Sequence, residues 1–167
     1  VLKFLDNFRK IDSNFLCYFV GGPSGKSGDD YLNQLKDNVK ELNLESNTEF
    51  LGNLTQIKIK ELMNRSKLLI HTSHFETFGL VAIEANTMGV PVLTTNQGPL
   101  SEIIENNVNG YLTEGLINSQ VNNFVKNLLN DDKQFQKFQM NCHEKSKKFD
   151  WKSTAKELEN LYNSALI

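Results

Sequence analysis

The chain has 167 residues, of which 39% are hydrophobic and 23% charged, and its formal net charge is -2. This composition describes one ordinary globular domain that can bury a core, and it excludes disordered and fibrous proteins. Without a basic stripe, the chain is not expected to bind nucleic acid in general. No apolar run reaches the roughly 20 residues of a membrane span, and Cys17 and Cys142 do not indicate a disulfide framework. A cytoplasmic location is therefore expected.

Helical and strand patterns alternate along most of the chain. Apolar residues at helical spacing predict helices, and short continuous apolar runs predict buried strands. In chain order the prediction is helix 2–11, strand 15–20, helix 31–42, strand 48–51, helix 57–63, strand 68–70, a helix around Glu84, strand 91–95, helix 101–105, strand 110–113, and helices 121–129 and 151–165. The apolar stripe of the last helix is expected to be core or a domain interface.

Continuous apolar strands that alternate with helices predict a parallel sheet covered on both faces. The predicted fold class is α/β, with a doubly wound, mostly parallel, Rossmann-like sheet, helices on both faces and a helical carboxyl-terminal tail. Such sheets bind ligands beyond the carboxyl ends of their strands. The functional residues are therefore expected in the loops 21–22, 52–53, 71–75 and 96–98.

Two glutamates, Glu76 and Glu84, lie on either side of a predicted strand-to-helix turn. Glu84 is the only charged residue between Glu76 and Glu102, and its neighbours in the helix are apolar. Burying a carboxylate there costs several kcal/mol unless a partner hydrogen-bonds it, and a ligand rich in hydroxyls would supply that partner. The alternative is that Glu84 reaches solvent at the edge of the helix.

The turn itself predicts an anion site. If the helix begins at Thr77 or Phe78, the backbone N–H groups around Phe78, Gly79 and Leu80 have no partners within the helix and can bind a diphosphate. Gly79 lets a ligand approach the backbone closely. The spacing of Ser73 and Glu76 also fits a capping box, which is the purely structural interpretation.

A second glycine-rich segment is similar to the phosphate-binding loop of nucleoside triphosphatases. It runs Val20-Gly21-Gly22-Pro23-Ser24-Gly25-Lys26-Ser27. The segment is one residue short of that pattern, and the next helix is predicted to begin near Asp29 or Asp30. No later strand ends in an aspartate suited to hold magnesium. A glycine-rich surface turn is the favoured interpretation, and a triphosphatase is the less favoured one.

The segment 76–84, together with Gly89-Val90-Pro91-Val92, resembles the signature of retaining glycosyltransferases of family 4. Further segments match that family in order, namely 20–22, 49–52, 107–112 and 149–151. The resemblance covers nearly the whole chain. It implies the GT-B architecture of two facing Rossmann-like domains, in which this chain corresponds to the carboxyl-terminal domain that binds the nucleotide sugar.

The resemblance also implies roles for individual residues. Glu76 is the catalytic candidate, because the family's first glutamate orients the donor sugar and stabilises positive charge at the anomeric carbon. Glu84 would bind the two ribose hydroxyls. The remaining donor-binding candidates are Phe78, Gly79, Leu80, Gly21 and Gly22. The reaction implied is transfer of a sugar from a nucleoside-diphosphate sugar to a glycan, lipid or small-molecule acceptor, with retention of the anomeric configuration. Neither a metal nor another cofactor is expected to take part.

The chain departs from the family in several places. Residues 1–167 are expected to form a donor domain without its first strand, which would be the central strand of the 3-2-1-4-5-6 order. The partner domain that binds the acceptor is expected in another segment of the same enzyme, so the chain alone is expected to be inactive. Pro99 also lies in a segment where the family usually has two glycines, and it lacks the backbone N–H group that could bind the donor sugar there. A noncatalytic nucleotide-sugar-binding or assembly module is the alternative, and peripheral contact of the full enzyme with a membrane is left open.

Two histidines, His71 and His74, lie near the predicted site. A lone histidine at the end of a strand is more often a surface or packing residue than a catalytic one. Neither is assigned a role from the sequence.

Overall fold

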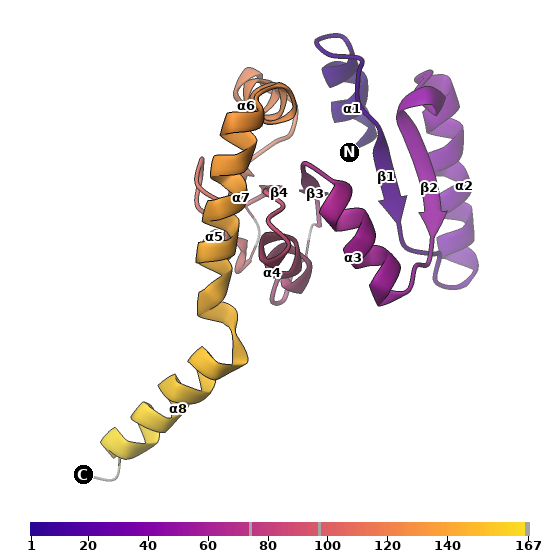
Figure 1. Ribbon diagram of the computed structural model, residues 1–167. Helices are drawn as coiled ribbons and strands as arrows, with labels where there is room; N and C mark the ends of the chain where they lie inside the picture. The colour runs from indigo at the N-terminus through magenta and orange to yellow at the C-terminus, as the bar shows by residue number, and fades with distance from the viewer. Residues whose placement is uncertain (74, 97, 166–167) are drawn as a thin grey trace. The chain divides into compact units, whose positions relative to one another are not determined.

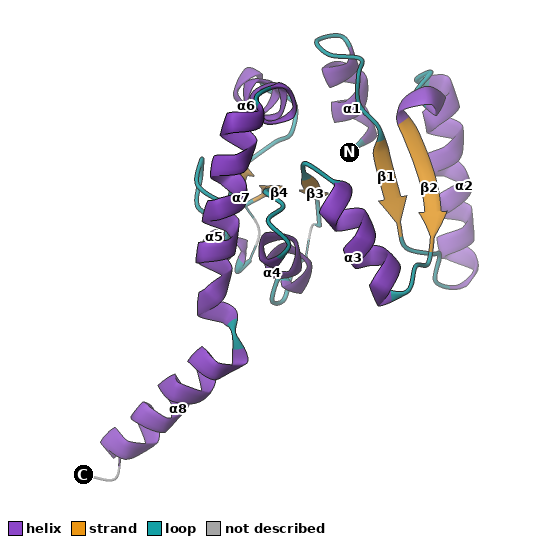
Figure 2. Cartoon of the chain, viewed as in Figure 1, coloured by secondary structure: helices purple, strands orange, loops and turns teal. Residues whose placement is uncertain are grey.

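The computed structural model describes residues 1–73, 75–96 and 98–165. The chain divides into two compact units, of which the first consists of Val1–Leu62 and Gly115–Lys126 and the second of Met63–Glu114 and Asn127–Ile167. Two helices, α3 (Gln56–Arg65) and α6 (Ser119–Asn130), contribute residues to both units. Figure 1 labels most of the helices and strands, and Figure 2 colours the chain by secondary structure.

The first unit contains a parallel pair of strands. Its elements are α1 (Leu2–Arg9), β1 (Cys17–Val20), α2 (Gly25–Glu41), the 3-10 turn η1 (Glu45–Asn47) and β2 (Thr48–Gly52). In the register of the pair, Cys17 lies opposite Thr48 and Phe19 lies opposite Phe50. The rings of Phe19 and Phe50 stack with their centroids 4.8 Å apart, so aromatic contact reinforces the ladder.

A buried asparagine connects the beginning of β2 to the segment before β1. Asn47 is 6% exposed, and its Nδ2 donates to the backbone oxygens of Ser13 at 3.0 Å and Phe15 at 2.9 Å. Buried polar groups are stable when they are hydrogen-bonded in this way. Asn47 therefore fixes where the chain enters β1.

The second unit contains three parallel strands in the order β3-β4-β5. Its elements are β3 (Leu69–His71), α4 (Leu80–Thr87), β4 (Val92–Thr95), α5 (Leu100–Ile103), β5 (Gly110–Thr113), α7 (Asp132–Ser146), the 3-10 turn η2 (Lys147–Phe149) and α8 (Trp151–Ala165). Its core joins α4, β4 and α5. The buried residues of this core are Ala82, Ala85, Val90, Val92, Leu100, Ile103 and Ile104.

Helix α4 is held at its carboxyl end by two buried asparagines. Asn86 and Asn109 are each 1% exposed. Asn109 Nδ2 donates to Asn86 Oδ1 and to the Ile103 oxygen at 2.8 Å, and Asn109 Oδ1 accepts from the Glu105 N–H at 2.7 Å. Asn86 Nδ2 in turn donates to the Val90 oxygen at 3.1 Å. This network fixes α4 relative to α5 and to the residue that precedes β5.

The observed elements confirm the α/β prediction, because the predicted strands are present and every described strand pair is parallel. The predicted beginning of α2 near Asp29 or Asp30 is wrong, since this helix begins at Gly25. For the last helix, the expectation of a core position is wrong, whereas a domain interface stays a prediction. Its apolar side chains Trp151, Leu158, Leu161 and Tyr162 are exposed in the described part of the chain, where they contribute to no core.

Among the helices within residues 1–73, 75–96 and 98–165, none combines the length and the apolarity that crossing a membrane needs.

Candidate functional site

The segment between β3 and α4 forms the centre of the candidate site. The carboxyl ends of β3 and β4 lie side by side, because His71 is the register partner of Thr94. Residues 72–79 then lead from β3 into α4, whose N-cap Gly79 has the left-handed backbone torsion φ of 82°. Glycine adopts this conformation without the steric cost that a Cβ brings. Of this segment, His74 lies outside the described residues.

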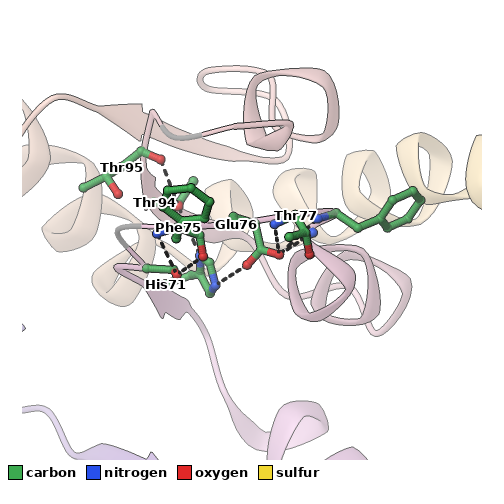
Figure 3. Close-up of polar contacts among 9 residues, drawn as sticks. His71, Phe75, Glu76, Thr77, Thr94 and Thr95 are labelled. Carbon is green, nitrogen blue, oxygen red and sulfur yellow. Dashed lines mark hydrogen bonds and ion pairs between the residues drawn. The ribbon is translucent and has the colours of Figure 1, made fainter.

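The Glu76 carboxylate accepts hydrogen bonds from the backbone that leads into α4. Its Oε1 accepts from the N–H groups of Thr77 at 3.0 Å, Phe78 at 3.2 Å and Gly79 at 2.8 Å. Figure 3 shows these bonds converging on one oxygen. Three backbone donors around one carboxylate oxygen form a strong anion site. In this structure, the side chain of Glu76 itself fills that site.

The second carboxylate oxygen of Glu76 faces His71. The distance from Oε2 to His71 Nε2 is 3.2 Å, and the two side chains are 18% and 15% exposed. The other ring nitrogen, Nδ1, lies 3.4 Å from Thr94 Oγ1. Figure 3 shows the imidazole between Thr94 and Glu76. A chain of polar contacts thus connects β4, β3 and the loop that carries Glu76.

Glycines allow the backbone to pack closely around Glu76. A Cβ at Gly98, whose φ is +55°, would lie 2.6 Å from the backbone carbonyl oxygen of Glu76. A Cβ at Gly79 would lie 2.7 Å from Ile103 Cδ1 and 3.1 Å from Leu100 Cδ2. Gly98 therefore needs glycine for space as well as for conformation, whereas at Gly79 the left-handed backbone is the main reason for glycine.

Electrostatics keep Glu76 ionised. The N–H groups of Gly79 and Phe78 are the main reason that its pKa lies below the ordinary value of 4.5, and the nearby His71 and the Thr77 N–H add to this effect. An ionised carboxylate accepts hydrogen bonds and attracts positive charge, but it cannot donate a proton. The geometry therefore favours an electrostatic or acceptor role for Glu76 over a general-acid role.

The structure decides three points about the turn that the sequence left as expectations or alternatives. Helix α4 begins at Leu80, and the N–H groups of Phe78 and Gly79 donate to Glu76, so they are not available to a ligand in this conformation. Glu84 is exposed, so its carboxylate carries no burial cost that a ligand must offset. Among the hydrogen bonds of the described residues, none involves the Glu84 carboxylate. The capping box with Ser73 also does not form as predicted, because Ser73 Oγ bonds to Phe75.

The predicted donor residues of the second unit lie near the beginning of α4. Phe78 and Leu80 are 56% and 62% exposed, while Gly79 is buried. Glu84 follows four residues after Leu80 in the same helix. The structure therefore places Glu76, Phe78, Gly79, Leu80 and Glu84 on one loop and one short helix.

Gly21 and Gly22 belong to the first unit. The Gly21 N–H donates to the Gly52 oxygen at 2.9 Å, which extends the pairing of the two strands. A Cβ at Gly22 would lie 2.5 Å from Asn53 Nδ2, so the loops after β1 and β2 touch at this glycine. Although α2 begins at Gly25, the segment before it is still one residue short of the triphosphatase loop.

The sequence assigned no role to His71, yet it lies 3.2 Å from the catalytic candidate. Its position directly before the loop after β3 is the signal that could have drawn attention to it, because such strand ends collect functional residues. Where residues are described, no group of three or more His, Cys, Asp or Glu side chains could hold a metal ion.

Comparison with known families gives a match over most of the chain. A family model for "Glycosyl transferases group 1" matches residues 1–149. The D-inositol 3-phosphate glycosyltransferase of Corynebacterium glutamicum is 29% identical over 160 residues, which are 95% of this chain and 37% of that protein. The alpha-1,3/1,6-mannosyltransferase ALG2 of Dictyostelium discoideum is 30% identical over 152 residues, which are 90% of this chain and 36% of that protein. The chain thus spans less than two fifths of the length of these relatives.

Comparison with solved structures agrees with the observed fold. The crystal structure of Anabaena HepE in complex with UDP superposes with a TM-score of 0.83 at 26% identity. The match covers 96% of this chain and 44% of that protein.

Proposed function

Because the chain belongs to the group 1 glycosyl transferases, we propose that it is the donor-binding part of a retaining glycosyltransferase of family 4. The donor is a nucleoside-diphosphate sugar, and no metal takes part in its binding. The observation that carries the proposal is the ionised Glu76 carboxylate at the beginning of α4, with Glu84 farther along the same helix. The similarity to HepE, which was crystallised with UDP, supports the choice of donor class.

In this proposal, Glu84 binds the ribose. Its carboxylate is exposed on α4 and offers two acceptor oxygens to the two hydroxyls of the sugar. Hydrogen bonds from hydroxyls to a charged group are stronger than those to a neutral group. Replacing Glu84 should therefore weaken nucleotide binding and leave the fold intact.

The diphosphate binds at the first residues of α4. Leu80 and Val81 are the first two residues of the helix, and their N–H groups have no acceptor within it. These groups and the helix dipole attract an anion. The Phe78 and Gly79 N–H groups act indirectly, because they hold the carboxylate of Glu76 in place.

Glu76 stabilises the reacting sugar. During transfer the bond between the anomeric carbon and the diphosphate oxygen breaks, and a bond from the acceptor oxygen to that carbon forms on the same face. The acceptor's proton passes to the departing diphosphate, so atoms and charges balance. Positive charge that builds on the anomeric carbon is stabilised by a nearby carboxylate, and ionised Glu76 has that property.

We further propose that residues 1–167 act together with a facing domain of the same enzyme. The chain covers 37% of its Corynebacterium relative, which supports a longer enzyme with a further domain. The 167-residue chain alone is expected to transfer no sugar, and turnover by the purified chain would contradict this.

The names of the relatives give no common acceptor. One is a D-inositol 3-phosphate glycosyltransferase and another is an alpha-1,3/1,6-mannosyltransferase. The proposed donor class is supported by the UDP complex of HepE.

Calorimetric titration with UDP, GDP and UDP-glucose tests the proposal. One of the diphosphates should bind the chain without metal, and Glu84→Ala should weaken that binding by roughly 1–3 kcal/mol, the size of a lost hydrogen bond to a charged group. Glu159→Ala is the matched control, because Glu159 is an exposed glutamate in α8. Equal affinities of wild type and Glu84→Ala would refute the ribose role.

Absence of binding by a well-folded wild type would mean that this chain does not carry a donor site by itself. The same titration on the chain joined to the segment that precedes it in its parent protein would then decide between an incomplete site and a wrong proposal.

A further inference from the structure

The contacts of Glu76 leave its two oxygens in different situations. Oε1 accepts three backbone N–H groups, whereas Oε2 faces the ring of His71 at 3.2 Å. A carboxylate that is held at one oxygen alone can still turn about that point. The contact with His71 fixes the second oxygen and therefore the plane of the carboxylate.

The proton on the His71 ring can be assigned from its partners. An ionised carboxylate can only accept, so Nε2 must carry the proton that it shares with Glu76 Oε2. The Thr94 hydroxyl lies 3.4 Å from Nδ1 and 3.2 Å from the Thr95 oxygen. Whichever of these two the hydroxyl bonds, the assignment at Nε2 is unchanged.

The contacts run from Thr94 to His71 and from His71 to Glu76, which is the order found in nucleophilic triads. Thr94, however, cannot serve as a nucleophile. Its side chain is fully buried, with 0% exposure, so no substrate atom can reach its hydroxyl. Thr94 supports the ring from behind, and at the other end of the chain of contacts the Glu76 side chain is 18% exposed.

We propose that His71 is a positioning residue that holds the Glu76 carboxylate so that one lone pair of Oε2 faces a hydroxyl of the donor sugar. The proposal rests on the proposed function for the identity of the ligand and on the contacts of His71 for the mechanism. His71 is suited to this task because it ends β3, which is paired with β4. It thereby ties the loop residue Glu76 to the sheet.

The ring proton provides a test that needs no ligand. In nitrogen-15 spectra of the wild-type chain, the Nε2–H signal of His71 should be present and slow to exchange. In Glu76→Gln the amide oxygen can keep the backbone bonds, so the amide NH₂ faces His71 and the ring must accept at Nε2. The Nε2–H signal should therefore be lost, while Thr94→Val should retain it. An unchanged signal in Glu76→Gln would overturn the contact.

The affinity for UDP-glucose tests the second part of the proposal, the contact of Glu76 with the donor sugar. His71→Phe should weaken UDP-glucose binding about 3- to 10-fold, the effect of one lost hydrogen bond, and should leave UDP binding unchanged. His71→Gln should restore most of the affinity, because its amide can donate to Oε2. His143→Gln is the matched control, because His143 is exposed on α7. The fold of each variant is checked from its amide spectrum.

A double-mutant cycle separates positioning from a general structural role. If His71 acts through Glu76, His71→Phe should have no further effect on UDP-glucose affinity in the Glu76→Gln background. An equal effect in both backgrounds, or equal weakening of UDP and UDP-glucose, would overturn the proposal. If the wild type binds neither ligand, the same variants are titrated in the longer chain that includes the preceding segment of the parent protein, and absence of binding there would overturn the sugar contact. The ring-proton experiment decides the pairing of His71 with Glu76 independently of any ligand.

Discussion

Replacing Asn109 by alanine should destabilise the second unit, because three hydrogen bonds are lost together. The side chain donates to Asn86 Oδ1 and the Ile103 oxygen and accepts from the Glu105 N–H. At about 0.5–1.5 kcal/mol each, the loss amounts to about 3 kcal/mol. The buried Asn86 oxygen is also left without its donor, which moves the expected value toward the upper end. Since Asn86 lies in α4, the effect should extend to the helix that carries Glu84.

Native-state hydrogen exchange of the β4 and β5 amides measures this effect within the second unit. A loss of about 3 kcal/mol should accelerate exchange on the order of 100-fold. Asn141→Ala removes one hydrogen bond, from Nδ2 to the Val108 oxygen at 3.1 Å, and should cost about 1 kcal/mol. Asn163→Ala, at an exposed position of α8, should change nothing. Exchange in Asn109→Ala no faster than in Asn141→Ala would refute the reasoning.

Three further predictions concern the site itself. Gly98→Ala should lower the free energy of unfolding by at least about 1–2 kcal/mol, because Gly98 has a left-handed backbone and a Cβ would lie close to the backbone oxygen of Glu76. Gly115→Ala is the control, because a Cβ there would meet nothing within 4 Å. Equal melting temperatures of the two variants would contradict this prediction. Since folding lowers the pKa of Glu76, its ionisation contributes stability above about pH 4.5 that is lost as the pH falls through the folded-state pKa. Denaturation of wild type and Glu76→Gln between pH 3 and pH 7 should show this loss in the wild type alone. UDP affinity should be the same in EDTA and in magnesium, and a marked increase with magnesium would refute the expectation of a metal-independent site.

The positions of the strands could be predicted because each is a short apolar run that ends at glycine or a polar residue. The beginning of α2 could not be predicted, because Gly25 and Gly28 both lower helix propensity and moved the expected start toward Asp29. In the structure Gly28 lies against Pro23, where a Cβ would lie 3.2 Å from the proline backbone. Gly28 thus fits the close packing of the first helical turn against Pro23, which helix propensity alone does not consider.

The sequence could place Glu76 and Glu84 around the turn, but it could not predict what each carboxylate contacts. That Glu76 folds back onto the backbone depends on the left-handed conformation of Gly79, which no residue pattern specifies. The role of His71 depends on the direction of a side chain at the end of a strand. Of the two alternatives for Glu84, burial against a ligand and exposure at the edge of the helix, the structure shows exposure, because an apolar helix can still expose one polar position.

The two oxygens of Glu76 make different contacts, and this affects how substitutions of this residue are interpreted. An alanine variant loses the backbone bonds at Oε1 and the outward contact at Oε2 together, so a drop in activity would combine disorder of the loop with loss of chemistry. Aspartate separates the two effects. Its shorter carboxylate is still a good acceptor for the N–H groups at the beginning of a helix, but it is drawn back by one methylene from His71. Glu76→Asp therefore measures the effect of losing the contact with His71, and Glu76→Gln measures the effect of losing the negative charge.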